Sequence, residues 1–193
     1  MGRLILQMMI TVDGMVSGPD GNLDWIANDP GISQDHLERL EQASAVVLGG
    51  ASYPSMRDAW AALANEKDAG SDMNGIGEAM NKTPIISFGH EDKPATGDDE
   101  VRVVKNDQEL VDGVQRLKEE TDGTLVSYGG VRFAQSLIRL DLVDEIHLDV
   151  CPVILGKGQP LFTDLTHDTQ LRLIKSTTHD SGATEMHYET VRS

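Results

Sequence analysis

The chain has 193 residues, of which 39% are apolar and 25% are charged. These values are typical of a globular protein and predict a single domain over residues 1–193. The formal net charge of −16 disfavours nucleic acid and anionic membranes as partners, because no cluster of Lys and Arg offsets it. A lone cysteine excludes an internal disulfide, and no apolar run approaches the roughly 18 residues of a membrane span. With no recognisable signal peptide, we expect a cytoplasmic protein.

Along the first third of the chain, apolar runs alternate with polar segments. Arg3–Val12 has the pattern of a strand, and a loop rich in Gly, Pro, Asp and Asn is expected over Asp13–Pro30. A helix is predicted from near Ser33, a fair N-cap residue. The short run Ala45–Leu48 indicates a strand covered on both faces, and a second helix is expected from about Ser52.

The middle of the chain predicts a loop, two strands and a helix. Asn65–Gly77 is expected to be an exposed loop, with a helical turn around Ile76–Met80 as a further possibility. Thr83–Phe88 and Val101–Val104 have the composition of strands. The tetrapeptide Asn106–Glu109 predicts a capping box, and the leucines and valines that follow it share one face of a helix.

The last part of the chain adds three more elements and a hairpin. Thr124–Tyr128, Val131–Arg139 and Glu145–Val150 predict a strand, a helix and another strand. Leu171–Thr178 and Thr184–Val191 are extended runs around a turn, which is typical of an antiparallel hairpin. Repeated β-α-β units favour parallel strands covered by helices. The sequence therefore predicts an α/β fold, a three-layer αβα sandwich with a mixed, mostly parallel sheet and a C-terminal antiparallel hairpin.

Two adjacent glycines follow two of the predicted strands, in VVLGGASYP (Val46–Pro54) and VSYGGVRFA (Val126–Ala134). Parallel sheets bind ligands outside the carboxyl ends of their strands. Glycine lets a phosphate approach the backbone amides there, and the helix that follows adds unpaired N–H groups. One such pair more commonly makes a tight turn, but two at equivalent places favour a phosphate-bearing ligand such as a dinucleotide.

Four stretches of the chain carry a recognisable set of motifs. They are TVDGMVSGPDGNLDW (Thr11–Trp25), VVLGGASYPSMRDAW (Val46–Trp60), TPIISF (Thr83–Phe88) and the block from VSYGG to PVILGKGQPLF (Val126–Phe162). In this order they resemble the dihydrofolate-reductase-like family, which includes the reductase domain of bifunctional riboflavin-biosynthesis deaminase-reductases. The resemblance implies the predicted sandwich, hydride transfer from NADPH and, in many relatives, a homodimer.

The resemblance also assigns roles to individual residues. Gly129 and Gly130 match a pair that faces the cofactor pyrophosphate, and Ser52 matches a hydroxyl that caps a helix beside a phosphate. Asp13 and Trp25 match residues at the reacting end, beside the nicotinamide and the substrate, and are the predicted catalytic residues. The full set of predicted cofactor-binding residues is Gly49, Gly50, Ser52, Ser87, Gly129, Gly130, Val131, Arg132 and Phe133.

Two positions depart from the family pattern. The family usually carries Arg after Gly49 and a Ser-Arg or Thr-Arg pair after the third strand, where this chain has Gly50 and the stretch Ser87-Phe88-Gly89-His90. Both missing arginines would contact the adenosine 2′-phosphate, so NADPH is the expected cofactor and NADH is the alternative. An arginine at position 50 is expected to raise NADPH affinity if Gly50 needs no positive φ. Other cations near the site are His90, Lys93 and Arg102.

Hydride transfer needs no protein nucleophile, but the protein must supply a proton where the substrate needs one. Asp13 is the first candidate for this polar group, followed by Asp29 and Asp35. Asp-Gly is also an ordinary turn pair, and the position of Asp13 at a strand end favours function. His147 and Asp149 alternate along one strand, which is consistent with a polar wall of the site or with a solvated face, and the solvated face is the favoured interpretation. No spacing of His and Cys indicates a metal site.

The resemblance thus predicts a reductase that transfers a hydride from NADPH, or from NADH, to a pterin, a pyrimidine or a related small substrate. The alternative is a non-catalytic nucleotide- or flavin-binding protein on the same scaffold. The missing arginines and the lack of an evident proton donor favour this alternative. A purely structural dimer is a third interpretation, which the retained glycines disfavour.

Overall fold

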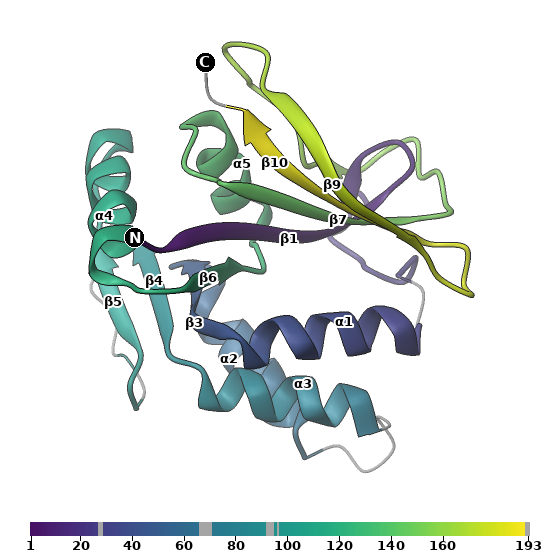
Figure 1. The fold of residues 1–193 in the computed structure, drawn as a ribbon, viewed down its shortest axis with the longest axis horizontal. Coiled ribbons are helices and arrows are strands. Elements are labelled where there is room, and N and C mark those ends of the chain that lie inside the picture. Colours follow the sequence, from purple (N-terminus) through teal and green to yellow (C-terminus); the bar gives the residue numbers. More distant parts are fainter. Residues whose placement is uncertain (27–28, 66–70, 92–94, 96, 192–193) are drawn as a thin grey trace.

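The central feature of the fold is an eight-stranded sheet (Figure 1). The computed structural model describes residues 1–26, 29–65, 71–91, 95 and 97–191. In spatial order the strands are β5 (Glu100–Val103), β4 (Ile85–Gly89), β3 (Ala43–Gly49), β6 (Thr124–Ser127), β1 (Arg3–Thr11), β7 (Glu145–Cys151), β10 (Thr184–Val191) and β9 (Gln170–Thr178). The strands from β5 to β7 are parallel, and β10 and β9 pair antiparallel at one edge. The mixed, mostly parallel sheet and its terminal hairpin are confirmed.

Helices cover both faces of the sheet (Figure 1). One face carries α4 (Asp107–Glu120) and α5 (Val131–Arg139), whose buried residues join a large apolar cluster. The other carries α1 (Pro30–Glu41), α2 (Tyr53–Leu63) and α3 (Ser71–Lys82), which contribute to a smaller cluster. No helix of the described residues is long and apolar enough to cross a membrane. A separate two-stranded ribbon joins β2 (Met15–Ser17) to β8 (Gln159–Pro160).

The central strand β1 shows why one face is richer in polar groups than the other. Leu4, Leu6 and Met8 are buried in the large apolar cluster with α4 and α5. Gln7 points to the opposite face, because successive side chains of a strand alternate, and it bonds to Arg39 of α1. The sheet therefore packs against α1 partly through polar contacts.

The start of α1 differs from the prediction. The helix begins at Pro30 rather than near Ser33, and Asp29 is its N-cap. The Asp29 carboxylate accepts the backbone N–H of Gly31 at 2.8 Å and, more weakly, that of Ile32 at 3.4 Å. Proline suits the first position of a helix because its missing N–H would have no partner there. Asp29-Pro30 is therefore a stronger start signal than Ser33.

The predicted loop Asn65–Gly77 is wrong over its second half, where α3 begins at Ser71. Residues 66–70 of that prediction lie outside the described part of the chain. The glycines that suggested a loop are packing positions of α3. A Cβ on Gly75 would lie 3.0 Å from the Leu37 side chain of α1, and one on Gly77 would lie 2.5 Å from the backbone nitrogen of Ala64 after α2. Close helix packing here outweighs the poor helix propensity of glycine.

Two local predictions in the second half of the chain are confirmed. Asn106 is the N-cap of α4, and its side chain accepts the Glu109 N–H at 2.9 Å. The Glu109 carboxylate reaches back in turn, but it accepts the backbone N–H of Lys105 and the side-chain amide of Asn106 rather than the Asn106 backbone N–H of a strict capping box. The hairpin of β9 and β10 turns through Gly182, whose φ is 83°.

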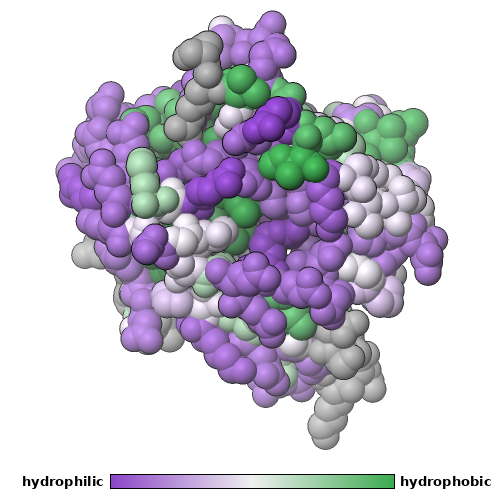
Figure 2. Space-filling model, viewed as in Figure 1, coloured by the Kyte–Doolittle hydropathy of each residue, from purple (hydrophilic) through white to green (hydrophobic). Residues whose placement is uncertain are grey.

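The face of the molecule seen in Figure 1 is mostly hydrophilic at its surface, with apolar patches near the top (Figure 2).

Candidate functional site

The two Gly-Gly junctions meet in space. Gly49 ends β3 and is followed by α2, while Gly129 and Gly130 follow β6 and lead into α5. A Cβ on Gly130 would overlap the Ser52 hydroxyl, so the first turn of one helix lies directly against the start of the other. Gly129 has a φ of 102°, which L side chains rarely adopt. Bare backbone from two strand ends is therefore brought together beside two helix N-termini.

A cleft of about 570 Å³ lies next to this meeting point. It runs from the carboxyl ends of β3 and β4 to the N-terminal turns of α4 and α5. Phe88 and Phe133 stack inside it, with ring centroids 6.2 Å apart and an interplanar angle of 16°. Five of the predicted cofactor-binding residues line the cleft: Gly49, Gly50, Ser87, Arg132 and Phe133. The lining does not include the other four, which are Ser52, Gly129, Gly130 and Val131.

The glycines after β3 have identifiable packing reasons. A Cβ on Gly49 would lie 2.7 Å from the Cβ of Phe133, so this glycine lets α5 approach the strand. A Cβ on Gly50 would lie 2.7 Å from the Cα of Gly89. Because backbone cannot move aside as a side chain can, an arginine at position 50 is not accommodated. Gly50 and Gly89 thus pack backbone against backbone at the ends of β3 and β4.

Two predicted serines occupy the expected places but make fewer bonds than expected. Ser52 is the N-cap residue of α2, yet its hydroxyl makes no capping hydrogen bond. Ser87 lines the cleft, and its hydroxyl is buried without a hydrogen-bond partner among the described residues. Buried hydroxyls normally find a partner. Both hydroxyls thus keep hydrogen-bonding capacity beside the glycine junctions.

The cations around the cleft differ in whether other residues already bind their side chains. Arg102 is bound by Glu100 and Glu120, with closest N–O distances of 2.8 and 2.9 Å. His90 lines the cleft, and its Nδ1 lies 2.8 Å from the carbonyl oxygen of Val104. Two further cations line the cleft, Lys105 and Arg132, and within the described part of the chain neither side chain forms an ion pair. Lys93 lies outside the described residues.

The two predicted catalytic residues do not line this cleft. The Asp13 carboxylate accepts hydrogen bonds from the Thr11 hydroxyl at 2.6 Å and from the backbone N–H groups of Leu155 and Gly156 at 3.2 and 2.7 Å. These bonds, led by that from Thr11, lower the pKa of Asp13 below its usual value. Asp13 therefore anchors the loop after β7 as a carboxylate. Trp25 is half-buried, and its indole Nε1 has no hydrogen-bond partner among the described residues.

The prediction that His147 and Asp149 face solvent is wrong, because both are buried beneath α1. Asp149 Oδ2 lies 2.7 Å from His36 Nε2 and accepts a hydrogen bond of 2.7 Å from Gln7 Nε2. Arg39 donates to the other end of the Gln7 amide at 2.6 Å, which fixes the orientation of that amide. The ring of His36 also lies 5.9 Å from that of Tyr128, the residue before Gly129. A buried carboxylate and a histidine thus form a hydrogen-bonded pair near the glycine junction.

The same polar layer continues into β10. Glu185 is 1% exposed and accepts hydrogen bonds from Arg39 at 2.8 Å and from His187 at 2.7 Å. Burial opposes the charge of Glu185, but the bonds from His187 and Arg39 hold its pKa below its usual range. The rings of His187 and His147 stack with centroids 3.6 Å apart. We name this set the polar layer: Gln7, His36, Arg39, His147, Asp149, Glu185 and His187.

The sequence matches the RibD C-terminal domain family over residues 3–184. The chain belongs to this family. It is 26% identical to the Bacillus subtilis protein YyaP over 186 residues, which cover 96% of this chain and 94% of YyaP. YyaP itself is uncharacterised.

Solved structures agree with this assignment at the level of the fold. A Shewanella sp. PV-4 protein named for riboflavin biosynthesis superposes with a TM-score of 0.72 at 23% identity, covering 98% of this chain and 99% of that one. Dihydrofolate reductase from Enterococcus faecalis, solved with NADP(H), gives a TM-score of 0.61 at 14% identity, covering 99% and 98% of the two chains. The dihydrofolate-reductase-like fold of this RibD C-terminal domain is thereby confirmed, and its family supports a reductase role in broad terms.

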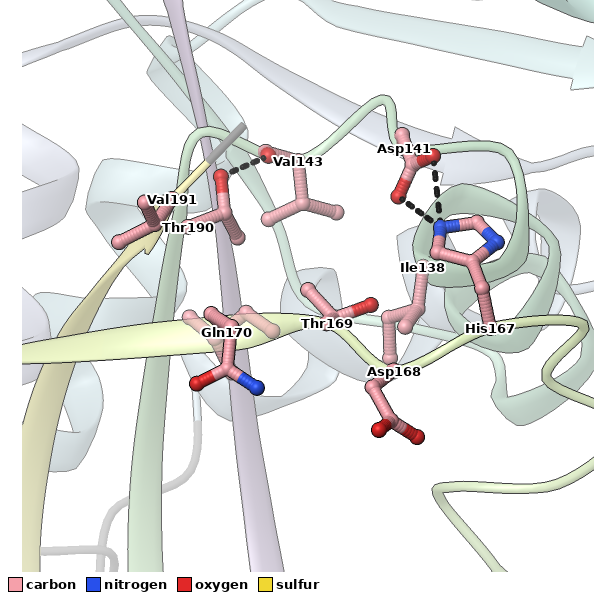
Figure 3. Close-up of a pocket in the computed structure, with 10 residues that line it drawn as sticks. Ile138, Asp141, Val143, His167, Asp168, Thr169, Gln170, Thr190 and Val191 are labelled. Atoms are coloured by element: carbon pink, nitrogen blue, oxygen red, sulfur yellow. Dashed lines mark hydrogen bonds and ion pairs between the residues drawn. The ribbon is translucent and has the colours of Figure 1, made fainter. Parts of the chain in front are cut away.

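A second, smaller pocket of about 230 Å³ lies near the amino end of β7 (Figure 3). Its wall includes Ile138 of α5, Thr190 of β10 and the loop before β9, where His167 pairs with Asp141 at 3.1 Å. None of the predicted site residues lines it. The pocket therefore has no part in the candidate site.

Proposed function

We propose that this protein is a reductase that transfers a hydride from a nicotinamide cofactor to a pterin, a pyrimidine or a related small substrate. The observation that carries the proposal is the meeting of the two Gly-Gly junctions, with Ser52 against Gly130, beside a cleft. Backbone amides at a helix N-terminus favour a phosphate, and glycine removes the Cβ that would hold it away. The complex of Enterococcus faecalis dihydrofolate reductase with NADP(H) supports the same class of cofactor.

NADPH is the proposed cofactor, with NADH as the alternative. The pyrophosphate would lie against Gly129, Gly130 and the first turn of α5, where the helix dipole favours negative charge. The adenosine phosphate would lie in the cleft near Lys105 and Arg132, whose charges are not paired by other described residues. These cations would replace the missing arginines. The otherwise acidic chain makes such local positive charge necessary for holding a phosphate.

His36 is the proposed proton donor, in place of Asp13. Hydride transfer to a C=N or C=O group leaves a nitrogen or oxygen that takes up a proton. The buried Asp149 carboxylate lies 2.7 Å from His36 Nε2 and would hold the ring in place. Asp13 would keep an indirect role, because its bonds to Leu155 and Gly156 position the loop at the strand ends. Its direct part in catalysis, and that of Trp25, stay predictions.

A homodimer through the edge strand β9 is part of the proposal. Most of β9 is exposed, including three apolar side chains, Leu171, Leu173 and Ile174. Apolar side chains gather near the top of Figure 2, where β9 begins in Figure 1. Long exposed edge strands with apolar residues tend to pair with another chain. Leu142, Val143 and Ile146 are buried in the core, so they do not offer a contact surface. A cytoplasmic location stays a prediction.

Calorimetric titration with NADPH, NADH and FMN separates the proposal from its alternative. A reductase should bind a nicotinamide nucleotide and oxidise it when supplied with one member of a panel of dihydropterins and aminopyrimidines. Under single-turnover conditions, His36→Asn should slow hydride transfer by about a hundredfold and leave the nucleotide dissociation constant nearly unchanged. Tight binding of FMN without binding of either nicotinamide nucleotide would instead support the non-catalytic flavin-binding protein.

A further inference from the structure

Three side chains that can bind a metal converge where the β9–β10 turn meets α1, on the right of Figure 1. Asp35 comes from α1, His179 from the turn and Glu185 from β10. One ligand atom of each lies within 4.8 Å of the other two. Because these segments are far apart in the sequence, no spacing motif could have indicated the cluster.

His179 is the member of this cluster whose surroundings point to a ligand. Its side chain is 7% exposed, and its Nε2 is buried without a hydrogen-bond partner among the described residues. The nearest carboxylate oxygen, on Asp35, is 3.9 Å away, which is too far for a hydrogen bond. A buried polar atom without a partner costs free energy. The nitrogen is thus directed at the two carboxylates with no bond made.

Each carboxylate has one oxygen to offer. Glu185 uses Oε1 for Arg39 and His187, which leaves Oε2 toward the cluster. Asp35 lies at the edge of the cluster, with its side chain 26% exposed, so an ion can enter from solvent on that side. Burial and the neighbouring Glu185 carboxylate raise the pKa of Asp35. A divalent cation would relieve the repulsion between the two carboxylates.

Lys175 of β9 already brings one positive charge to the rim of the cluster. Its Nζ lies 3.4 Å from Glu185 Oε2 and 4.0 Å from Asp35 Oδ2. Nearly half of the lysine side chain is exposed, so it can withdraw into solvent when another cation enters. Lys175 would therefore compete with a metal ion for the two carboxylates.

We propose that Asp35, His179 and Glu185 form a binding site for a divalent transition-metal ion that joins the β9–β10 hairpin to α1. One imidazole nitrogen with two carboxylate oxygens suits Zn²⁺, Co²⁺ or Mn²⁺ better than Mg²⁺ or Ca²⁺, which prefer oxygen ligands alone. Tetrahedral Zn²⁺ places its ligand atoms about 3.4 Å apart, so these atoms must draw in by about 1 Å. The site does not depend on the proposed reductase activity.

The site is tested by titrating the purified, metal-free protein with Zn²⁺ in a calorimeter and with Co²⁺ in a visible spectrometer. Four chains are compared, which are the parent and the variants His179→Ala, Lys175→Met and His167→Ala. We expect one Zn²⁺ per chain and intensified Co²⁺ absorption in the parent. His179→Ala should weaken Zn²⁺ binding by at least about tenfold, since it removes a ligand. His167→Ala, which changes an exposed histidine outside the cluster, should bind as the parent does.

Lys175→Met gives the sharpest expectation, because removal of a competing charge should tighten Zn²⁺ binding several-fold. Bound Zn²⁺ should also raise the melting temperature, since the ion binds only the folded chain. If His179→Ala does not fold, Asp35→Asn serves in its place with the same expected loss. The proposal is overturned if the parent binds no Zn²⁺ at millimolar concentration. It is equally overturned if His167→Ala weakens binding as much as the cluster variant does, or if Lys175→Met weakens it.

Discussion

The cleft and the polar layer are built in opposite ways on the same sheet. At the ends of β3 and β4 the cleft is lined by backbone rather than by side chains, because Gly49, Gly50 and Gly89 have no Cβ. The polar layer beneath α1 consists instead of charged side chains such as Arg39 and Glu185, which are shielded from solvent and hydrogen-bonded to each other. A ligand site made of backbone needs few side chains, whereas a buried polar layer needs every partner in place.

This difference predicts that damage to the two regions has different consequences. A change at an exposed side chain of the cleft, such as Lys105, should alter binding and leave folding nearly intact, because that side chain is free to serve a ligand. A change in the polar layer should first cost stability, because a buried charge without its partner is unfavourable.

Arg39→Met should have the largest effect, and on stability. The substitution keeps much of the side-chain volume but leaves Glu185 buried without its guanidinium partner. We expect a loss of about 3 kcal/mol in the free energy of unfolding. Arg102→Met is the control, because it breaks exposed ion pairs with Glu100 and Glu120 and should cost less than about 1 kcal/mol. Urea unfolding of both variants checks this. Equal losses in the free energy of unfolding would show that the buried ion pair stabilises the fold no more than the exposed ones do.

Gly130→Asp should produce the converse result. A carboxylate beside the Ser52 hydroxyl would stand where the pyrophosphate is expected, and we predict about a hundredfold weaker NADPH binding. The Ser52 hydroxyl must turn away from the new Cβ in any variant of Gly130. Gly130→Ala adds the Cβ without the charge and should weaken binding less. Calorimetric titration of the two folded variants provides the comparison. Unchanged binding in Gly130→Asp would mean that the nucleotide binds elsewhere.

Lys105→Met tests the adenosine end of the cleft. A hydrogen bond to a charged group contributes roughly 1.5–3 kcal/mol, so the loss of this cation should weaken NADPH binding about tenfold and leave NADH nearly unaffected. Arg102→Met again serves as the control, because Arg102 is held by two glutamates. Parallel titrations with both nucleotides decide the point. An equal loss for NADPH and NADH would place Lys105 away from the 2′-phosphate.

Asp29 links α1 to the hairpin, and it should make a smaller, pH-dependent contribution. The Ser181 side chain and the N–H groups of Ser181 and Gly31 lower the pKa of Asp29 to about 2. Since the folded-state value is depressed, the stabilisation is present above about pH 4 and is lost as the pH falls toward about 2. Asp29→Asn keeps the cap but removes the charge. Between these pH values the parent should lose about 1 kcal/mol more stability than the variant, and parallel acid-unfolding curves would contradict this.

The parts that could be predicted from the sequence are local. Gly49, Gly129 and the strand runs before them predicted the junctions, because the signal for a strand end followed by a helix lies within a few residues. The helix cap at Asn106 could be predicted for the same reason. The resemblance then named residues of the cleft, although the arginine proposed for position 50 fails because Gly50 contacts the Gly89 backbone.

The parts that could not be predicted depend on distant segments. Alternating polar residues on β7 indicated a solvated face, and only the position of α1 over the sheet places Asp149 against His36. The glycines of α3 suggested a loop because their packing partners, Leu37 and Ala64, lie outside the local window. The partner of a buried polar group is a property of the tertiary fold rather than of the local pattern.

The most direct test of the proposed reductase is the crystal structure of the protein with NADPH. In that complex the pyrophosphate should accept hydrogen bonds from backbone N–H groups at Gly130 and in the first turn of α5, with the adenosine phosphate near Lys105. The nicotinamide should then point toward Tyr128 and His36. A nucleotide bound with its pyrophosphate away from the N-terminus of α5, or no bound nucleotide at saturating concentration, would contradict the proposed reductase.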